Sequence, residues 1–319
     1  MRRILLSMGG LLVALLAFSH AVAPAAELQK VRVSIIPIND VAPLFVAIHN
    51  GYFKDVGIEI DTTPTTGGAT GIPGLVGGSF DISYGNVVSA LLASQQGLNV
   101  RVIAQVTKRY DRKTDTTPII VRADSGIKSG KDLEGKSLAV NTRNNVIWLY
   151  ARAWVKATGG DPEKVTFKEV PFPQMEDALL QKRIDAAFLV APFSIVALKK
   201  PELTTVAYPY SDLQMGVNVG QWITTTKVMA DKPEVIKKFV AGWRKGVEWY
   251  NENRTNPVLY SIITGYSKTD ASVLKTVALE KAPLKCDLPQ IKTTMDLMIE
   301  NKLLTKPLDL SKIIDPLAL

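Results

Sequence analysis

The chain has 319 residues, of which 46% are hydrophobic and 21% are charged, and its formal net charge is +8. This composition is typical of a globular protein and excludes a disordered, collagen-like or coiled-coil chain. The one cysteine, Cys286, excludes an intramolecular disulfide and a four-cysteine metal site. Because His20 lies in a segment that we expect to be removed, His49 is the one imidazole left for a metal, a triad or a general base. We therefore expect no metal site and no cofactor.

Residues 1–25 have the three parts of a secretory signal. Met1-Arg2-Arg3 is a basic start, residues 4–18 form an apolar run, and small residues follow. The sequence Ala23-Pro24-Ala25 predicts cleavage after Ala25. The apolar run is shorter than the roughly 20 residues that a membrane span requires, so we expect an exported protein rather than an anchored one.

Removal of residues 1–25 leaves 294 residues with a formal net charge of +6. The basic pairs, such as Lys108-Arg109 and Lys199-Lys200, have no repeated aromatic partner, and the sequence therefore does not predict nucleic-acid binding. The length is about twice that of a typical domain, which predicts two lobes.

Strands and helices alternate along the first two thirds of the chain. The hydrophobic patterns predict strands over 31–36, 58–60, 80–84 and 100–106, with helices over 43–50, after the glycine-rich turn 66–70, and over 87–96. A second series follows, with strands over 118–121, 137–140, 165–167 and 186–190, and helices over 145–158 and 175–182. Helices of this length between strands predict parallel crossovers and an α/β, doubly wound architecture.

The chain after residue 231 is expected to be mostly helical. Apolar residues recur at helical spacing over 235–250, which makes Trp243 a core residue rather than a ligand contact. Two further helices are expected, one around Leu274, Val277 and Ala278 and the other around Met295, Met298 and Ile299.

Several motifs, taken in their order along the chain, resemble the NMT1/THI5-like solute-binding proteins. That family includes nitrate, sulfonate, taurine and formylaminopyrimidine receptors of ABC importers. The resemblance covers nearly the whole chain after residue 25 and is carried by Ala47-Ile48-His49-Asn50-Gly51-Tyr52-Phe53-Lys54, Gly78-Ser79-Phe80-Asp81-Ile82, Asp124-Ser125-Gly126-Ile127, Asp132-Leu133-Glu134-Gly135-Lys136, Asp185-Ala186-Ala187, Pro192-Phe193 and 233–250.

The resemblance implies a type II periplasmic binding protein, in which two doubly wound lobes are joined by a two-segment hinge. Lobe one would comprise residues 26–113 and 218–319, lobe two would comprise residues 114–217, and the hinges would lie at 111–117 and 213–220. Such a protein would act in the periplasm as a monomer. It would close over a small solute and deliver it to an inner-membrane ABC permease.

The candidate binding residues lie at four turns from strand to helix. Ligands of open parallel sheets bind beyond the carboxyl ends of the strands, where helix N-termini present free N–H groups. Glycines permit a close approach of the backbone, and the Asn and Thr side chains add hydrogen bonds. The four turns supply Asn39 and Asp40; Gly68, Ala69 and Thr70; Tyr84 and Asn86; and Asn141, Arg143 and Asn144.

Each candidate has a structural alternative. Asn39, Asn86, Asn144 and Thr70 can serve as helix caps, and Tyr84 can belong to the core. Arg143 can hold a carboxylate or sulfonate through two hydrogen bonds, or form a surface salt bridge. Phe193 and Trp222 are candidates for apolar walls of the site, and Trp148 can pack on a ligand ring or on the surface of its own lobe.

One departure from the family bears on the ligand. Several relatives have an acidic residue immediately before the Pro-Phe pair, where it can hold a ligand amine, whereas this chain has Ala191. The departure argues against an aminosulfonate such as taurine, although Asp40 can take over that role. We therefore expect an organic anion, a carboxylate or sulfonate, with an aromatic or apolar body against Tyr84, Phe193 and Trp222.

Two other functions remain open at this point. The fold family includes pyrimidine-precursor synthases of the THI5 type, which have a cysteine-rich motif and an active-site histidine. With Cys286 and His49 alone, this chain does not reproduce that pattern, and we expect no catalysis. A receptor that reports to a membrane sensor is the second alternative, and the sequence does not separate it from a transporter component.

Overall fold

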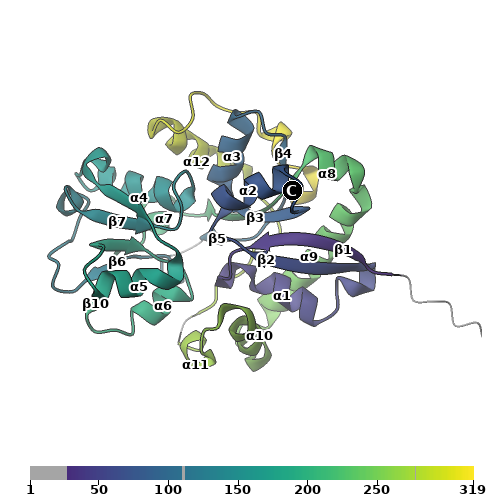
Figure 1. The fold of residues 1–319 in the computed structure, drawn as a ribbon, viewed down its shortest axis with the longest axis horizontal. Coiled ribbons are helices and arrows are strands. Elements are labelled where there is room, and N and C mark those ends of the chain that lie inside the picture. The colour runs from purple at the N-terminus through teal and green to yellow at the C-terminus, as the bar shows by residue number, and fades with distance from the viewer. Residues whose placement is uncertain (1–26, 110–111, 277) are drawn as a thin grey trace, which may run out of the picture.

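The computed structural model describes residues 27–109, 112–276 and 278–319. Two five-stranded sheets lie in separate lobes, and helices cover each sheet (Figure 1). The expected signal segment with its cleavage position, Asp111 of the expected hinge, and Val277 lie outside the described residues. The predicted two-lobe α/β architecture is confirmed.

The sheet of lobe one has the strand order β2-β1-β3-β12-β4. β1 (Gln29–Ile35) runs parallel to β2 (Ile58–Pro64) and to β3 (Ile82–Asn86). β12 (Gly220–Thr225) lies between β3 and β4 (Val100–Gln105) and is antiparallel to both. The four predicted strands of this lobe therefore run in the same direction, as expected. The strand that runs against them is β12, which was not predicted and which enters the sheet after the chain returns from the other lobe.

The sheet of lobe two has the strand order β10-β6-β9-β7-β8. β7 (Ser137–Val140) runs parallel to β8 (Thr166–Glu169) and to β9 (Ala186–Phe188). β6 (Ile119–Arg122) is antiparallel to β9 and to the edge strand β10 (Leu203–Ala207). The strand predicted over 118–121 is β6, and the expectation of parallel strands was wrong for it. In both lobes, the first strand that the chain adds to the sheet after crossing between the lobes runs antiparallel to its neighbours.

The helices follow the predicted alternation in both lobes. Lobe one contains α1 (Ala42–His49), α2 (Gly68–Val76), α3 (Val87–Gln95) and α8 (Thr226–Asp231), and lobe two contains α4 (Val146–Ala157), α5 (Phe172–Leu180), α6 (Phe193–Ala197) and α7 (Pro209–Leu213). Short 3₁₀ turns occur at Asn39–Val41, Lys54–Val56, Lys131–Leu133, Pro162–Lys164, Leu310–Lys312 and Pro316–Ala318.

The C-terminal third is mostly helical, as expected. α9 (Pro233–Glu252) packs on α1 and buries the predicted apolar stripe, including Phe239 and Trp243. α10 (Pro257–Ser267) also packs on α1, whereas α12 (Leu288–Glu300) packs on α3. The helix expected around Leu274 is the short α11 (Ala271–Leu274). Across the described ranges, no helix combines the length and the apolar character that a membrane crossing requires.

The two segments that connect the lobes lie side by side. β5 (Lys108–Arg109) and β11 (Val217–Asn218) pair as a two-stranded antiparallel ribbon. β11 lies within the expected hinge segment 213–220, and β5 ends just before the other expected segment, 111–117.

Candidate functional site

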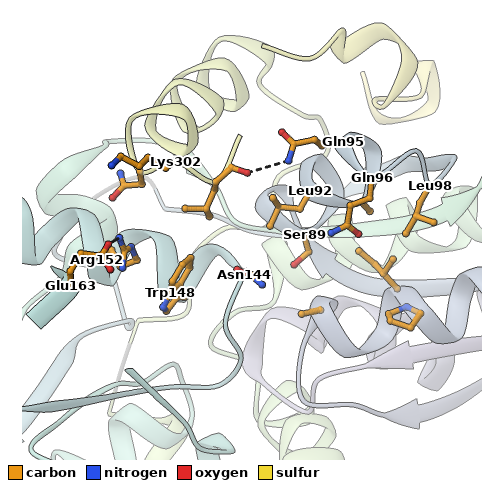
Figure 2. A pocket seen from close by; sticks show the side chains of 16 residues that line it. Ser89, Leu92, Gln95, Gln96, Leu98, Asn144, Trp148, Arg152, Glu163 and Lys302 are labelled. Carbon is orange, nitrogen blue, oxygen red and sulfur yellow. Dashed lines mark hydrogen bonds and ion pairs between the residues drawn. The ribbon is translucent and has the colours of Figure 1, made fainter. Parts of the chain in front are cut away.

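One hollow between the lobes is a groove at their outer edge, with a volume of about 620 Å³. Ile72 of α2 and Leu92 of α3 contribute from lobe one, and Asn144 and Trp148 contribute from lobe two (Figure 2). The Arg152 guanidinium lies over the Trp148 ring, 4.8 Å from its centroid, and pairs with Glu163. Trp148 therefore packs against residues of its own lobe at the edge of this groove.

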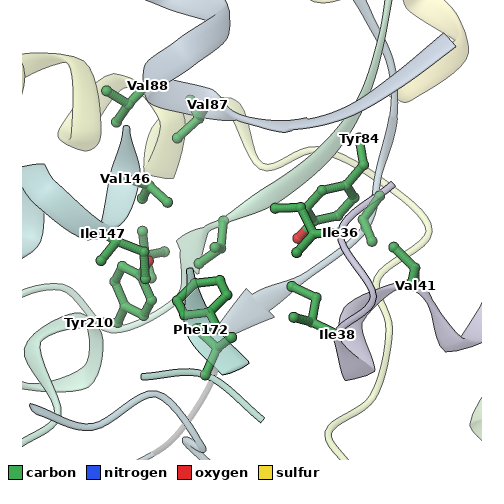
Figure 3. Close-up of a cluster of buried hydrophobic side chains, with 14 of the residues drawn as sticks. Ile36, Ile38, Val41, Tyr84, Val87, Val88, Val146, Ile147, Phe172 and Tyr210 are labelled. Atoms are coloured by element: carbon green, nitrogen blue, oxygen red, sulfur yellow. The ribbon is translucent and has the colours of Figure 1, made fainter. Parts of the chain in front are cut away.

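The second hollow, which we call the cleft cavity, lies deeper between the two sheets. Its walls are mostly apolar and come from both lobes: Ile36, Ile38, Tyr84, Val146, Ile147, Phe172, Val190, Tyr210 and Val219 (Figure 3). Its polar lining residues are Asp40, Asn86, Arg109, Thr117, Asn141 and Asn145. Most of these residues follow the carboxyl ends of β1, β3, β7 and β9, which is where ligands of doubly wound sheets bind.

The cleft cavity has a volume of about 30 Å³, which is enough for one or two water molecules. Because both lobes supply its walls, separation of the lobes would enlarge it. An apolar cavity with a few convergent polar groups is typical of a small-molecule site.

Hydrogen bonds beside the cleft cavity join the two lobes. The Asn86 side-chain oxygen accepts from Val146 N–H at 3.2 Å, and Asn141 Nδ2 donates to the Thr66 carbonyl at 2.8 Å. On the other side, Asn39 N–H donates to the Ala191 carbonyl at 3.1 Å. Each of these bonds joins a residue of lobe one to a residue of lobe two, so each must break when the lobes separate.

Two asparagines also cap the helices that begin at the cleft cavity. Asn86 Oδ1 accepts from Ser89 N–H in the first turn of α3, and Asn145 Oδ1 accepts from Trp148 N–H in the first turn of α4. Asn145 Nδ2 donates to Asn141 Oδ1 and Thr142 Oγ1, both at 2.8 Å. The two asparagine side chains therefore accept hydrogen bonds from some of the N–H groups that these helix N-termini would otherwise offer to an anion.

A buried ionic cluster forms the deep end of the cleft cavity. The Arg109 side chain is 4% exposed, and its guanidinium lies 3.3 Å from Asp40, 2.6 Å from Glu280 and 3.8 Å from Asp115. Asp40 also accepts hydrogen bonds from the Tyr84 hydroxyl at 2.9 Å and the Thr107 hydroxyl at 2.8 Å. Three carboxylates thus surround one guanidinium.

Burial determines the protonation of the groups around this cluster. Desolvation raises the pKa of Glu280, although Arg109 acts in the opposite direction. Desolvation and the Asp40 charge raise the pKa of Tyr84 well above its usual value, and desolvation does the same for the pKa of Tyr210. Both phenols therefore remain protonated hydrogen-bond donors at neutral pH.

Seven of the twelve predicted site residues line one of the hollows. Asp40, Tyr84, Asn86 and Asn141 line the cleft cavity. Asn39 lies beside Asp40 in a small adjoining hollow, which Arg109, Tyr250 and Glu280 also line. Ala69 and Asn144 line the outer groove.

The other five predicted residues do not line these hollows. Gly68 packs against Gly85 with no room for a Cβ, and Thr70 is exposed and bonds to the Gly67 carbonyl. Arg143 was expected to hold an anion, but it is exposed and its guanidinium donates to the Phe167 carbonyl at 2.7 Å. Phe193 stacks on the outer side of Phe172, with ring centroids 6.2 Å apart.

Trp222 is a core residue and not the wall of a site. It lies on β12, an interior strand of its sheet, is 0% exposed, and packs edge-on against Trp243 and Phe239 with ring centroids 5.5 Å apart. Its place just past the second crossing made it a candidate for an apolar wall. The burial of all six residues of β12 explains the difference.

Several lining residues were missed, among them Arg109, Asn145, Phe172 and Tyr210. Two of them follow strand ends and could have been found by the same argument: Asn145 is the true cap of α4, and Phe172 begins α5 after β8. Arg109 and Tyr210 lie next to the crossings, and the hydrophobic pattern gives no signal for either residue.

His49 and Cys286 lie outside the cleft cavity. His49 is exposed at the last residue of α1, and the Cys286 thiol is buried, which raises its pKa to about 12. In the described ranges, no group of three His, Cys, Asp or Glu side chains is arranged to hold a metal ion.

Comparison with known proteins identifies relatives of this architecture. A Brachyspira hyodysenteriae protein named as an ABC transporter periplasmic binding protein is 26% identical over 54% of this chain and 52% of its own length. The riboflavin-binding protein RibY of Chloroflexus aurantiacus is 27% identical over 71% of this chain and 64% of its own length. The chain thus spans less than two thirds of the length of these two relatives.

A solved structure agrees with the fold. The alkanesulfonate-binding protein SsuA of Xanthomonas axonopodis pv. citri, bound to MOPS, superposes with a TM-score of 0.74 at 15% identity, covering 88% of this chain and 96% of that protein. The family model described as "NMT1/THI5 like" matches residues 38–256, which is more than half of the chain. The chain belongs to the NMT1/THI5-like family.

Proposed function

We propose that this protein is the periplasmic receptor of an ABC importer. It captures a small solute between its lobes and delivers it to a membrane permease, without chemical conversion. The observation that carries the proposal is the cleft cavity, which is lined from both lobes at the carboxyl ends of their strands and adjoins a paired two-segment crossing. Such a site can close around a solute and release it again.

The relatives support this function. One is named as an ABC transporter periplasmic binding protein and another as a riboflavin-binding protein. The chain has neither the cysteine-rich motif nor a histidine in the cleft cavity that a THI5-type synthase would need. We propose export through residues 1–25, action as a monomer, and lobes divided at residues 113/114 and 217/218.

The solute has a ring or another flat apolar body. Tyr84, Phe172 and Tyr210 line the cleft cavity together with branched aliphatic side chains, and such walls exclude water from a ring. The expectation of an anionic head group rested on the helix N-termini and on Arg143. Arg143 lies outside this lining, and Asn86 and Asn145 cap two of the helix N-termini. The charge of the solute therefore depends on the groups that line the cavity.

A thermal-shift screen of residues 26–319 tests the proposed function. The panel contains aromatic amides, carboxylates and amines, pyrimidines, riboflavin, alkanesulfonates, taurine and nitrate, after unfolding and refolding to remove retained solute. A solute at about 100 times its Kd stabilises the folded state by roughly 2.7 kcal/mol. We expect a shift confined to one class, with the solute recovered unchanged. Turnover, or no shift with any member, would contradict the proposal.

A further inference from the structure

Two buried polar atoms of the cleft-cavity residues lack hydrogen-bond partners among the described residues. One is the Tyr210 hydroxyl and the other is Arg109 Nε. Tyr210 is 0% exposed and the Arg109 side chain is 4% exposed. Buried polar groups are nearly always paired, because an unpaired one loses about 1–3 kcal/mol of solvation.

Both atoms carry a hydrogen to donate. The guanidinium stays charged, and its Nη atoms are already committed to Asp40 and Glu280, so the Nε–H group remains. The nearest carboxylate oxygen to Nε is Asp115 Oδ1 at 3.8 Å, which is beyond hydrogen-bond distance, and it already accepts from Thr117. Both donors belong to residues that line the cleft cavity, Arg109 from β5 and Tyr210 from α7.

The carboxylates of the cluster already accept hydrogen bonds from the protein. Asp40 accepts from Tyr84 and Thr107, Asp115 from Thr117 and Ser211, and Glu280 from Arg109 and Thr114. In the adjoining hollow, Asn39 Oδ1 is a buried acceptor without a partner among the described residues. An acceptor of the solute can therefore pair with the two donors, and an N–H group of the solute can pair with Asn39 Oδ1.

The charge of the cluster restricts which acceptor fits. One guanidinium faces three carboxylates, so the cluster has a formal charge of −2 when all of them are ionised. The only other cation lining the cleft cavity or its adjoining hollow, within the part of the chain described, is Lys281, which is exposed. A further anion in this buried space would be repelled by charges that one guanidinium does not neutralise.

We infer that Tyr210 Oη and Arg109 Nε donate hydrogen bonds to an uncharged acceptor of the solute, a carbonyl oxygen or a ring nitrogen, and that the cleft discriminates against anions. This inference rests on the proposed function and specifies its substrate class. The positive charge of Arg109 is then balanced by its own carboxylates, and its Nε–H group acts toward the solute as a hydrogen-bond donor.

Three isosteric probes of different charge test the inference: benzamide, benzoate and the benzamidinium ion. Binding is measured by ligand-observed NMR and calorimetry, and again with the naphthalene homologues. We expect the amide to bind at least tenfold more tightly than the carboxylate, and also more tightly than the amidinium ion, which has no acceptor. A carboxylate that binds as tightly as the amide, or an amide that does not bind in either series, would overturn the inference.

A pair of tyrosine variants tests whether the Tyr210 hydroxyl donates the hydrogen bond to the amide. Tyr210→Phe removes the unpaired hydroxyl, and we expect amide affinity to fall at least threefold while the stability of the solute-free protein is kept. Tyr52→Phe is the control, because the Tyr52 hydroxyl accepts from Asn50 Nδ2 at 3.2 Å within lobe one and Tyr52 does not line the cleft cavity. It should leave amide affinity within twofold. Equal affinity losses in both variants would contradict the assigned role.

The outcomes separate this inference from the proposed function. Tight binding of carboxylates or sulfonates, recovered unchanged, would overturn the inference and leave a receptor. Failure of every solute in the wider screen would contradict both.

Discussion

The Asn86 side-chain oxygen, at the end of β3 in lobe one, accepts a hydrogen bond from Val146 N–H at the start of α4 in lobe two. The same oxygen accepts from Ser89 N–H of its own helix, at 3.0 Å. One atom therefore caps a helix and joins the two lobes across the cleft cavity. Its helix-capping bond lies within lobe one, whereas the proposed separation of the lobes would break its contact with Val146.

Replacement of Asn86 should affect both stability and solute binding. Asn86→Ala removes the cap of α3, which should lower the free energy of unfolding by about 1 kcal/mol in urea denaturation. It also removes a bond present only in the closed form, so solute affinity measured by calorimetry should fall about tenfold. Asn256→Ala removes a similar cap from α10, away from the cleft, and serves as the control. An equal loss of affinity in the control would contradict the closing role of Asn86.

Arg143→Ala should leave solute affinity within twofold of the wild-type value. Its guanidinium donates to the Phe167 carbonyl and does not line the cleft cavity. Calorimetry with the solute identified in the screen measures the effect. A loss of more than tenfold, in a variant with an unchanged circular dichroism spectrum, would return Arg143 to the binding site.

Trp222→Ala should destabilise the protein without changing the site. Removal of a fully buried indole from the packed contacts with Phe239 and Trp243 should cost about 3–5 kcal/mol in thermal or urea unfolding. Trp222→Phe keeps most of the volume and should remain folded, with solute affinity within about threefold. A large loss of affinity in this milder variant, with little loss of stability, would show that Trp222 contacts the solute.

Asp81 should make stability depend on pH in the acid range. Its burial alone would raise its pKa, but hydrogen bonds from Arg32 and Lys232 outweigh this effect and lower the pKa to about 2. The unfolded chain binds this proton with a pKa near 3.9, so the stabilisation is present above about pH 4 and is lost as pH falls toward 2. Asp81→Asn should lower the free energy of unfolding by roughly 2 kcal/mol at pH 7 and by less at pH 3. The same difference between wild type and variant at both pH values would contradict this linkage.

Much of the fold could be predicted because its strands and helices have clear hydrophobic periods. The strands over 29–35, 82–86 and 137–140 lie where alternating or continuous apolar runs were found. β12 was missed because Gly220–Thr225 carries polar residues, whose burial depends on partners far away in the sequence: the Thr224 hydroxyl donates to the Asp81 carbonyl. A hydrogen bond between residues so far apart in the sequence leaves no pattern in the local sequence.

The site could be predicted only in part, for a similar reason. Strand ends identify Asn86 and Asn141, because every such turn meets the same edge of its sheet. Arginine usually lies at the protein surface. Arg109 is buried because Asp40, Asp115 and Glu280, from three separate segments of the chain, surround its guanidinium. Tyr210 reaches the cavity from the short α7, which has too few residues for a period to be recognised.

The most direct test of the account compares Phe172→Ala with Phe193→Ala. Phe172 lines the cleft cavity. Phe193 stacks on the Phe172 ring but does not line that cavity. Calorimetry is carried out with the tightest solute from the screen, under conditions in which both variants are folded. If the cleft cavity is the binding site, Phe172→Ala should weaken binding at least tenfold and Phe193→Ala less than threefold, with one solute bound per chain. Equal affinities of both variants and the wild type would show that the solute binds elsewhere and would contradict the account.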